Sequence, residues 1–124
     1  MTFKPEEWAS NEKVGTAYSF KHHDKFHGIL ETKLGAYRGN HVHPYHQYTL
    51  LLRGKAKNIL FLEGERREVV LEIGKVAVVE AGVPHILVPE TDIFTFEWWD
   101  GDFEAEGCTG IFDDLTSVRV GPQD

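Results

Sequence analysis

Four side chains that can bind a metal ion occur at short intervals in this sequence. His41, His43 and Gln47 lie close together, and His85 follows a Gly-Val-Pro turn. Residues two apart on a β-strand point to the same face, so His41 and His43 can converge on one ion, and continued alternation places Gln47 with them. Imidazole suits zinc, copper, iron and nickel, whereas an amide oxygen is a weaker ligand. The pattern predicts a metal site made of His41, His43, Gln47 and His85.

His46 is the alternative fourth ligand. Under strict alternation it lies on the face opposite His41 and His43. Pro44 cannot donate to a strand ladder and often marks a bulge, and a bulge there would turn His46 inward. His46 is therefore a reserve ligand and a candidate for moving a proton. The simpler interpretation is that these histidines are polar residues of a barrel interior that holds no ion.

Four further side chains are candidates for chemistry around such an ion. Glu97 lies on a strand whose other face is apolar, and burial inside a barrel would raise its pKa and suit it to general-base catalysis. Arg38 directly precedes the histidines, and on a barrel rim it could pair with a carboxylate or phosphate. Tyr45 and Trp99 could line the mouth and contact a ligand, although aromatic residues at strand spacing are more often core. We therefore assign His46 and Glu97 as candidate catalytic residues, and Arg38, Tyr45 and Trp99 as candidate ligand-binding residues.

The elements that must position these residues are short strands. Val, Ile, Thr, Phe, Tyr and Trp dominate the apolar residues, and glycines divide residues 28–101 into pieces of strand length. This spacing is typical of antiparallel strands in a sandwich or barrel. The predicted strands are Ile29–Leu34, Tyr48–Leu52, Ala56–Leu62, Glu68–Ile73, Val76–Glu80, Ile86–Val88 and Ile93–Trp99.

Length and composition restrict the class of protein. The 124 residues predict one domain, with a barrel core over residues 28–99, an N-terminal arm over 1–27 and an acidic tail over 100–124. The net charge of −7 argues against a nucleic-acid partner. A single cysteine, Cys108, excludes an internal disulfide and favours a reducing compartment, so we expect a cytoplasmic protein. No apolar run approaches the roughly 20 residues of a membrane span, so no membrane partner is expected.

The intervals between glycines and histidines resemble the first motif of the cupin superfamily. That motif is Gly, five residues, His-x-His, three or four residues, usually Glu, six residues, Gly. The sequence places Gly35, His41, His43, Gln47 and Gly54 at these intervals. Gln47 in place of Glu leaves the ligand set without a negative charge, which weakens the binding of a cation.

The second cupin motif is Gly, five residues, Pro-x-Gly, two residues, His, three residues, Asn. Gly74, Gly82 and His85 fit it, while Glu80 and Pro89 replace its Pro and Asn. The resemblance implies an all-β, cupin-type jelly-roll β-barrel (a double-stranded β-helix) with a metal site in its mouth. It also implies a divalent ion such as Zn, Ni, Mn or Fe, and commonly a homodimer.

Residues 38–43, Arg-Gly-Asn-His-Val-His, followed by Gln47, are also similar to a stretch in cupins of nucleotide-sugar biosynthesis. That group includes ketoisomerases in which histidines are thought to move protons without a metal. The resemblance favours an isomerase or epimerase acting on a small oxygen-rich ligand, such as a sugar or keto acid. An iron-dependent dioxygenase and a non-catalytic small-molecule sensor are the alternatives. We expect a homodimer stabilised by the arm before Lys25, because an arm can cross onto a neighbour's sheet edge.

Overall fold

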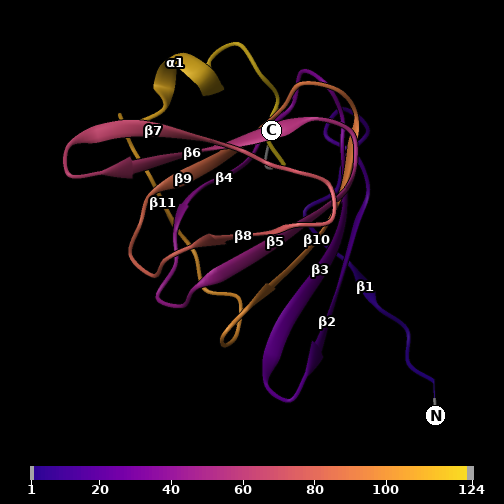
Figure 1. Cartoon of the computed structure of the whole chain (residues 1–124). Helices are drawn as coiled ribbons and strands as arrows, with labels where there is room; N and C mark the ends of the chain where they lie inside the picture. The colour runs from indigo at the N-terminus through magenta and orange to yellow at the C-terminus, as the bar shows by residue number, and fades with distance from the viewer. Residues whose placement is uncertain (1, 123–124) are drawn as a thin grey trace.

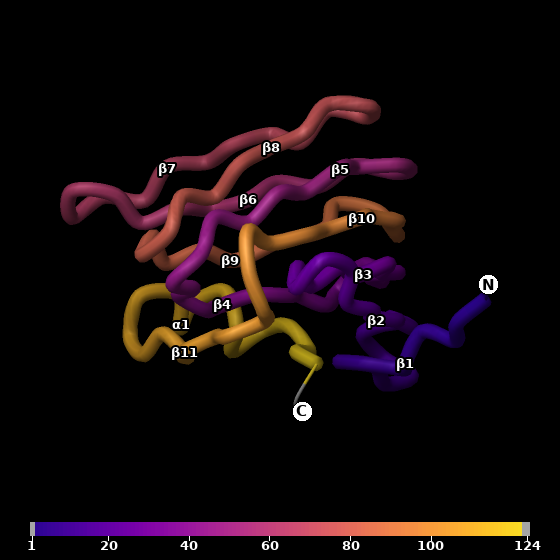
Figure 2. Tube along the Cα trace, turned by 90° about the horizontal axis from the view of Figure 1, so that it is seen from below, coloured from indigo at the N-terminus to yellow at the C-terminus, as the bar shows by residue number. Residues whose placement is uncertain are grey.

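Two antiparallel sheets form the molecule in this computed structural model, which describes residues 2–122. The larger sheet has the strand order β1-β2-β3-β10-β5-β8, and the smaller has the order β11-β4-β9-β6-β7. The two sheets lie face to face (Figures 1 and 2). The strands are β1 (Glu6–Glu7), β2 (Ala17–His22), β3 (Lys25–Thr32), β4 (Arg38–Val42), β5 (Gln47–Arg53), β6 (Ala56–Leu62), β7 (Glu65–Val70), β8 (Val76–Val79), β9 (His85–Pro89), β10 (Ile93–Trp99) and β11 (Glu106–Gly107).

The predicted all-β class is confirmed, and two predicted strands match β6 and β10 residue for residue. The prediction for β7 was wrong by three residues at each end. Glu63 and Gly64 both adopt positive φ, at 53° and 78°. Such a two-residue turn joins antiparallel strands tightly, so β7 begins at once after it. The one helix among the described residues, α1 (Asp113–Thr116), has four residues, and no helix there is long and apolar enough to cross a membrane.

The regions predicted as arm and tail contribute to the sheets. Residues 1–27 include β1, β2 and the start of β3, and β2 alternates buried and exposed residues along its first half. The six-stranded sheet therefore begins before residue 28. In the tail, β11 pairs with β4, and Val120 forms a single parallel bridge with Ala36.

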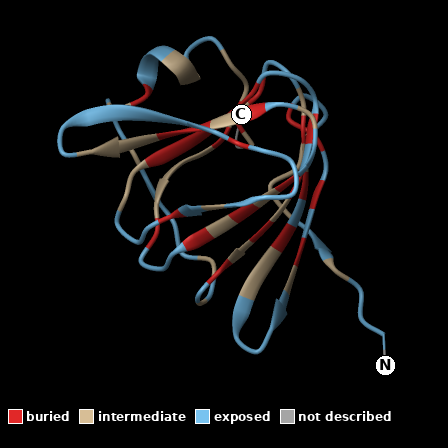
Figure 3. Ribbon diagram, viewed as in Figure 1, coloured by how far each residue is buried: buried red, intermediate tan, exposed pale blue. Residues whose placement is uncertain are grey.

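The core is divided between the interior and the outside of the smaller sheet. Between the sheets, one cluster fills one end of the sandwich; its members are Leu51, Ala56, Leu71, Leu87 and Ile93. Outside the smaller sheet, Phe112 from the C-terminal segment packs on Ile86 and Val88 of β9. All five residues of β9 are consequently buried (Figure 3).

A bulge in β4 decides which of its side chains enter the interior. Arg38 pairs with Leu87, but the register then shifts so that His41 pairs with His85. Asn40 is the extra residue, and it adopts a positive φ of 65°. Without this insertion, Arg38 and His41 would point to opposite faces, because they are three positions apart. The bulge turns both of them inward.

Candidate metal and ligand site

A cavity of about 470 Å³ lies between the sheets and collects side chains from both. His41 and His85 enter it as cross-strand partners on β4 and β9, and His43 follows β4 directly. Gln47 enters from the opposite sheet, where it is the first residue of β5. The four predicted ligands therefore face one cavity. Volumes of this size are typical of sites for small molecules.

The three histidine rings are neighbours, and the proton positions of His43 and His85 are defined. Ring centroids are 5.8 Å apart for His41 and His43, and 5.1 Å apart for His43 and His85. Nδ1 of His43 lies 2.7 Å from the Glu104 carbonyl oxygen, and Nδ1 of His85 lies 3.0 Å from that of Val83. Carbonyl oxygens only accept, so each Nδ1 carries the hydrogen and each Nε2 has a free lone pair. Such second contacts orient histidines that bind metals through Nε2.

Two of the acceptor atoms in the cavity are buried and unpartnered within residues 2–122. They are Nε2 of His85 and Oε1 of Gln47. Gln47 donates its amide hydrogens to Oε1 of Glu97 at 3.0 Å and to Oγ1 of Thr49 at 3.4 Å. Because the amide nitrogen uses both hydrogens in these bonds, the Oε1 atom of Gln47 is left without a hydrogen-bond donor. Buried polar atoms are nearly always satisfied, so two orphaned acceptors in one cavity indicate a missing donor or cation.

Glu97 is the one carboxylate among the described residues that line this cavity. Its side chain is buried on β10, as the sequence predicts for a residue pointing into the barrel. Its oxygens accept hydrogen bonds from Gln47 and from Oγ1 of Thr95, the latter at 3.0 Å. Burial raises the pKa of Glu97, while the hydrogen bond from Thr95 and the charge of Arg38 act in the opposite direction. The carboxyl group is therefore poised to hold a proton.

Burial also keeps the histidines neutral. Burial, with a smaller contribution from the neighbouring His43, lowers the pKa of His41 from 6.5 to about 4. The pKa of His85 is likewise lowered to about 4, mainly by burial. For His43, burial lowers the pKa, and hydrogen bonding of the protonated ring to the Glu104 backbone and to Gln47 would act in the opposite direction. Neutral imidazole is the form that binds metals.

Aromatic side chains form one wall of the cavity. Trp99 is 2 % exposed, and its ring contacts His43 and Phe103 at centroid distances of 5.5 and 5.2 Å. Trp8 contacts Phe103 at 5.0 Å. The indole N–H of Trp99 has no hydrogen-bond acceptor within the described chain. This wall supplies one orphaned donor beside the orphaned acceptors.

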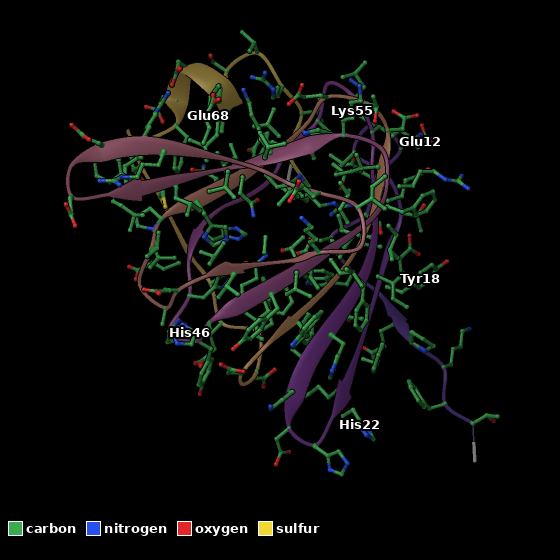
Figure 4. The ribbon with its side chains drawn as sticks, in the orientation of Figure 1. Glu12, Tyr18, His22, His46, Lys55 and Glu68 are labelled. Carbon is green, nitrogen blue, oxygen red and sulfur yellow. The ribbon has the colours of Figure 1, made fainter. Side chains whose placement is uncertain are left out.

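The structure places His46 and Tyr45 outside the cavity, contrary to their predicted roles. The chain turns between β4 and β5, and the bulge lies at Asn40 rather than at Pro44. His46 is exposed, and its Nδ1 accepts the Ala81 backbone N–H at 2.8 Å (Figure 4). Tyr45 is 36 % exposed and packs against Gly101, where an added Cβ would lie 2.6 Å from its ring. Gln47 thus enters on a new strand, not by continued alternation.

Arg38 is buried rather than on an exposed rim. It donates to the carbonyl oxygens of Ala9 and Glu31, each at 2.7 Å, and to Oγ1 of Thr32 at 2.8 Å. Burial lowers its pKa to about 10, although the charges of Glu97 and Glu31 act in the opposite direction. The guanidinium group joins the N-terminal segment to β3. This arrangement favours a structural role over the predicted ligand-binding one.

Sequence reasoning missed several residues of the site. Trp8 comes from the region predicted as an arm, and Phe103 from the tail. Asn40 also lines the cavity, and its Oδ1 is a third buried acceptor that lacks a donor in the described structure. The glycine before Asn40 was the available signal, since Gly-Asn is a pair that tolerates positive φ. Trp8 and Phe103 carry no periodic signal, because loops rather than strands bring them to the cavity.

The donor set fits a divalent metal ion by its chemistry. Three neutral imidazoles and one amide oxygen face the same space, and the Nδ1 contacts of His43 and His85 leave Nε2 available. Across residues 2–122, however, no three His, Cys, Asp or Glu side chains form a ready-made metal site. A bound ion would therefore have to draw the rings closer together than they lie in this structure.

Comparison with known proteins gives matches at the level of structure. No protein-family model matches the chain, and no curated protein matches it. A Bacillus subtilis oxalate decarboxylase variant has a TM-score of 0.73 at 18% identity, over 90% of this chain and 31% of its own. The capsular polysaccharide assembling protein CapF from Staphylococcus aureus has a TM-score of 0.69 at 19% identity, over 86% of this chain and 32% of its own. A complex of CapF with the inhibitor 3-isopropenyl-tropolone scores 0.70 at 21% identity, over 86% and 35%.

These similarities establish the fold. Oxalate decarboxylase and CapF are both members of the cupin superfamily, and the chain has the cupin jelly-roll barrel that the histidine and glycine intervals predict. The chain spans about a third of the length of these solved structures.

Proposed function

We propose that the cavity binds a divalent metal ion together with a small oxygen-rich ligand. The observation that carries the proposal is the pair of buried, orphaned acceptors, Nε2 of His85 and Oε1 of Gln47, in one cavity. His41, His43 and His85 would hold the ion, and Gln47 would be a weaker ligand. Zinc, nickel, manganese or iron would suit imidazole ligands. When bound, such an ion supplies a Lewis acid that polarises a carbonyl oxygen.

The remaining polar groups suit a ligand rich in hydroxyl and carbonyl groups. The Trp99 indole N–H can donate to a ligand oxygen, and Oδ1 of Asn40 can accept from a hydroxyl. The aromatic wall of Trp8, Trp99 and Phe103 excludes water from one side of the cavity. A small sugar or keto acid combines these requirements with a size that a cavity of about 470 Å³ admits.

The proposed reaction is isomerisation or epimerisation next to a carbonyl. Glu97 is the proton-transfer residue, since it is the carboxylate of the cavity and burial raises its pKa. It would take a proton from the carbon beside the carbonyl and return it to a different position or face. The similarity of the fold to CapF, a capsular polysaccharide assembling protein, supports a sugar as the ligand. His46 does not enter this proposal, because its exposed ring lies outside the cavity.

A non-catalytic binding module is the second candidate. Both carboxylate oxygens of Glu97 already accept hydrogen bonds, one from Gln47 and one from Thr95. A fully bonded carboxyl group can serve to hold Gln47 in place rather than to move a proton. In that case the cavity would bind the same ligand without changing it.

Deuterium exchange distinguishes the two candidates. The protein, loaded with nickel or manganese, is incubated in D₂O with a panel of keto sugars and 2-keto acids, and proton NMR follows the hydrogens beside each carbonyl. We expect exchange with at least one compound, and a loss of about a hundredfold or more in Glu97→Gln. Tyr45→Phe, altered outside the cavity, should exchange at the parent rate. Ligand binding without exchange would overturn the isomerase proposal and support the binding module.

A further inference from the structure

The outer face of the six-stranded sheet carries two continuous apolar rows that cross five strands. Alternation turns every second residue of β2, β3, β10, β5 and β8 away from the interior. The first row consists of Phe20, His27, Trp98, Tyr48 and Val78, paired in register from strand to strand. The second row consists of Tyr18, Ile29, Phe96, Leu50 and Val76, paired in the same way. Apart from His27, the indole N–H of Trp98 and the hydroxyl groups of the tyrosines, both rows are hydrocarbon.

Ring contacts make this outer face a single surface. Phe20 stacks on His27 at a centroid distance of 4.8 Å, and Tyr48 stacks on Trp98 at 5.3 Å. Phe3 extends the first row beyond β2, since it contacts Phe20 at 5.4 Å while remaining 65 % exposed. Figure 4 shows the side chain of Tyr18 pointing away from the sheet. Monomeric proteins rarely expose a continuous apolar surface of this extent, and such surfaces mark interaction sites.

Charged residues lie at both ends of the rows. Below the first row, at the end of the strands near the β2–β3 turn, lie Lys25 on β3, Glu80 after β8 and Asp100 after β10, whose carboxylate accepts the Tyr48 hydroxyl at 2.9 Å. Beyond the second row lie Glu31 on β3 and Arg53 on β5, whose guanidinium stacks on Phe94 at 5.9 Å. On β3 the cation precedes the first row and the anion follows the second. On the side of the sheet formed by β5 and β8, the anion Glu80 lies below the first row and the cation Arg53 lies beyond the second row.

We propose that a second copy of this chain covers the outer face, related by a two-fold axis perpendicular to the strands and passing between the two rows. This axis lays the first row of one copy on the second row of the other. It brings Lys25 of each copy opposite Glu31 of the other copy. It also brings Glu80 of each copy toward Arg53 of the other copy. An interface of this kind uses the same patch on both copies, so self-complementary charge is the property it requires. The strands of the two stacked sheets stay roughly aligned, which is a common packing of sheets.

The extent of the face suits a stable dimer. Five strands about 4.8 Å apart and four residue rows about 6.8 Å apart make a flat area of roughly 600 Å². Protruding side chains and Phe3 add to this accessible area, and a standard interface buries about 800 Å² on each partner. An anionic membrane is a poorer occupant, because the chain carries a net charge of −7 and membranes attract cationic surfaces.

The dimer proposed here differs from the arm-exchanged dimer expected from the sequence. In the described chain the arm lies on its own sheet: β1 pairs with β2, and the Trp8 N–H donates to the Ala17 carbonyl oxygen at 3.0 Å. Trp8 also packs against Trp99 and Phe103 of the cavity wall. Residues 6–8 of the arm are therefore bound to their own chain, whereas within residues 2–122 the outer face is only partly covered, by Phe3 at its β2 edge.

Sedimentation equilibrium of the full chain tests the proposal. The parent should be a dimer at about 50 µM, and Ile29→Glu and Val76→Glu should each raise the dissociation constant at least about a hundredfold by burying a charge in the interface. Both positions are more than 40 % exposed, so the fold should survive, which circular dichroism checks. Val118→Glu, at an exposed apolar residue off this face, should remain a dimer. A monomeric parent, or glutamate variants that still dimerise, would overturn the proposal, as would a monomer that binds lipid vesicles.

Charge reversal tests the arrangement of the two copies. Lys25→Glu alone should raise the dissociation constant about tenfold, because each dimer contains two such pairs. Combining it with Glu31→Lys should restore parent-like dimerisation. If the double variant dimerises no better than the single one, the proposed two-fold axis is wrong.

Discussion

The imidazole of His85 shows how a single residue acquires its chemistry from its surroundings. The Val83 carbonyl fixes the hydrogen on Nδ1, and burial between the sheets keeps the ring neutral. Its free Nε2 then faces the cavity with Oε1 of Gln47. Neither residue carries a charge, so the site would leave the full charge of a divalent ion uncompensated. That feature distinguishes it from sites with a carboxylate ligand.

The missing carboxylate can be supplied by Gln47→Glu. The substitution places a negative charge beside the ion, so metal affinity should rise at least about tenfold, since one elementary charge at contact distance is worth more than 1 kcal/mol. Without metal, the variant should be less stable than the parent, because Glu97 lies 3.0 Å from the amide nitrogen being replaced. Calorimetric titration with nickel measures the affinity, with Gln47→Ala as the control. Equal affinities for parent and Gln47→Glu would show that residue 47 is not a ligand.

The lowered histidine pKa values predict a specific loss of stability in acid. In the unfolded chain His85 takes up a proton near pH 6.5, but in the folded chain it does so only near its pKa of about 4. The free energy of unfolding should therefore fall as the pH drops from about 6.5 to 4, with a contribution of roughly 3 kcal/mol from His85.

Urea unfolding of metal-free protein across this pH range measures the effect. His85→Gln cannot take up a proton, so its stability should fall less steeply than that of the parent. His22→Gln, at the exposed β2–β3 turn, should follow the parent slope. If His85→Gln keeps the parent slope, the ring is not held neutral by burial.

At the scale of elements, the bulge in β4 is the feature that assembles the site. One extra residue, Asn40, turns both Arg38 and His41 inward and moves Asn40 itself to the cavity. Arg38 then uses its position to hold the N-terminal segment and β3, through the carbonyl oxygens of Ala9 and Glu31. The same bulge therefore supports the cavity wall and presents a ligand.

Removing that support should loosen the N-terminal segment. Arg38→Met abolishes the hydrogen bonds to Ala9, Glu31 and Thr32, and should cost about 4 kcal/mol or more of unfolding free energy, since bonds from charged donors are worth about 1.5–3 kcal/mol each. Limited proteolysis should cut residues 1–16 faster than in the parent. Arg67→Met, at an exposed arginine, is the matched control and should alter neither measurement. Parent-like protection of the segment in Arg38→Met would contradict this role.

At the scale of the whole molecule, local patterns predict the strands well and the connections poorly. The Gly-bounded apolar runs give β6 and β10 directly, and the intervals around His41, His43 and His85 bring these three residues to one cavity. These features depend on period-two alternation within single strands. Glu97 was found inside the barrel for the same reason.

The features that the sequence did not predict depend on contacts between segments that are far apart in the chain. His46 faces outward because the chain turns into a new strand at Gln47, and its ring binds the backbone of Ala81. Trp8 and Phe103 reach the cavity from opposite ends of the chain. The residue pattern around Trp8 and the pattern around Phe103 give no indication that these two side chains are in contact.

If the histidines of the cavity, His41, His43 and His85, hold a divalent ion inside the barrel, isothermal titration calorimetry with nickel or zinc should detect its binding. The parent should bind one ion per chain. His85→Ala should weaken binding at least about a hundredfold, because it removes one of the three imidazole ligands. His46→Ala, altered at the exposed ring outside the cavity, should bind as the parent does. If His85→Ala and the parent bind the ion equally well, or if His46→Ala is the variant that loses it, the metal lies elsewhere and the account of this cavity is wrong.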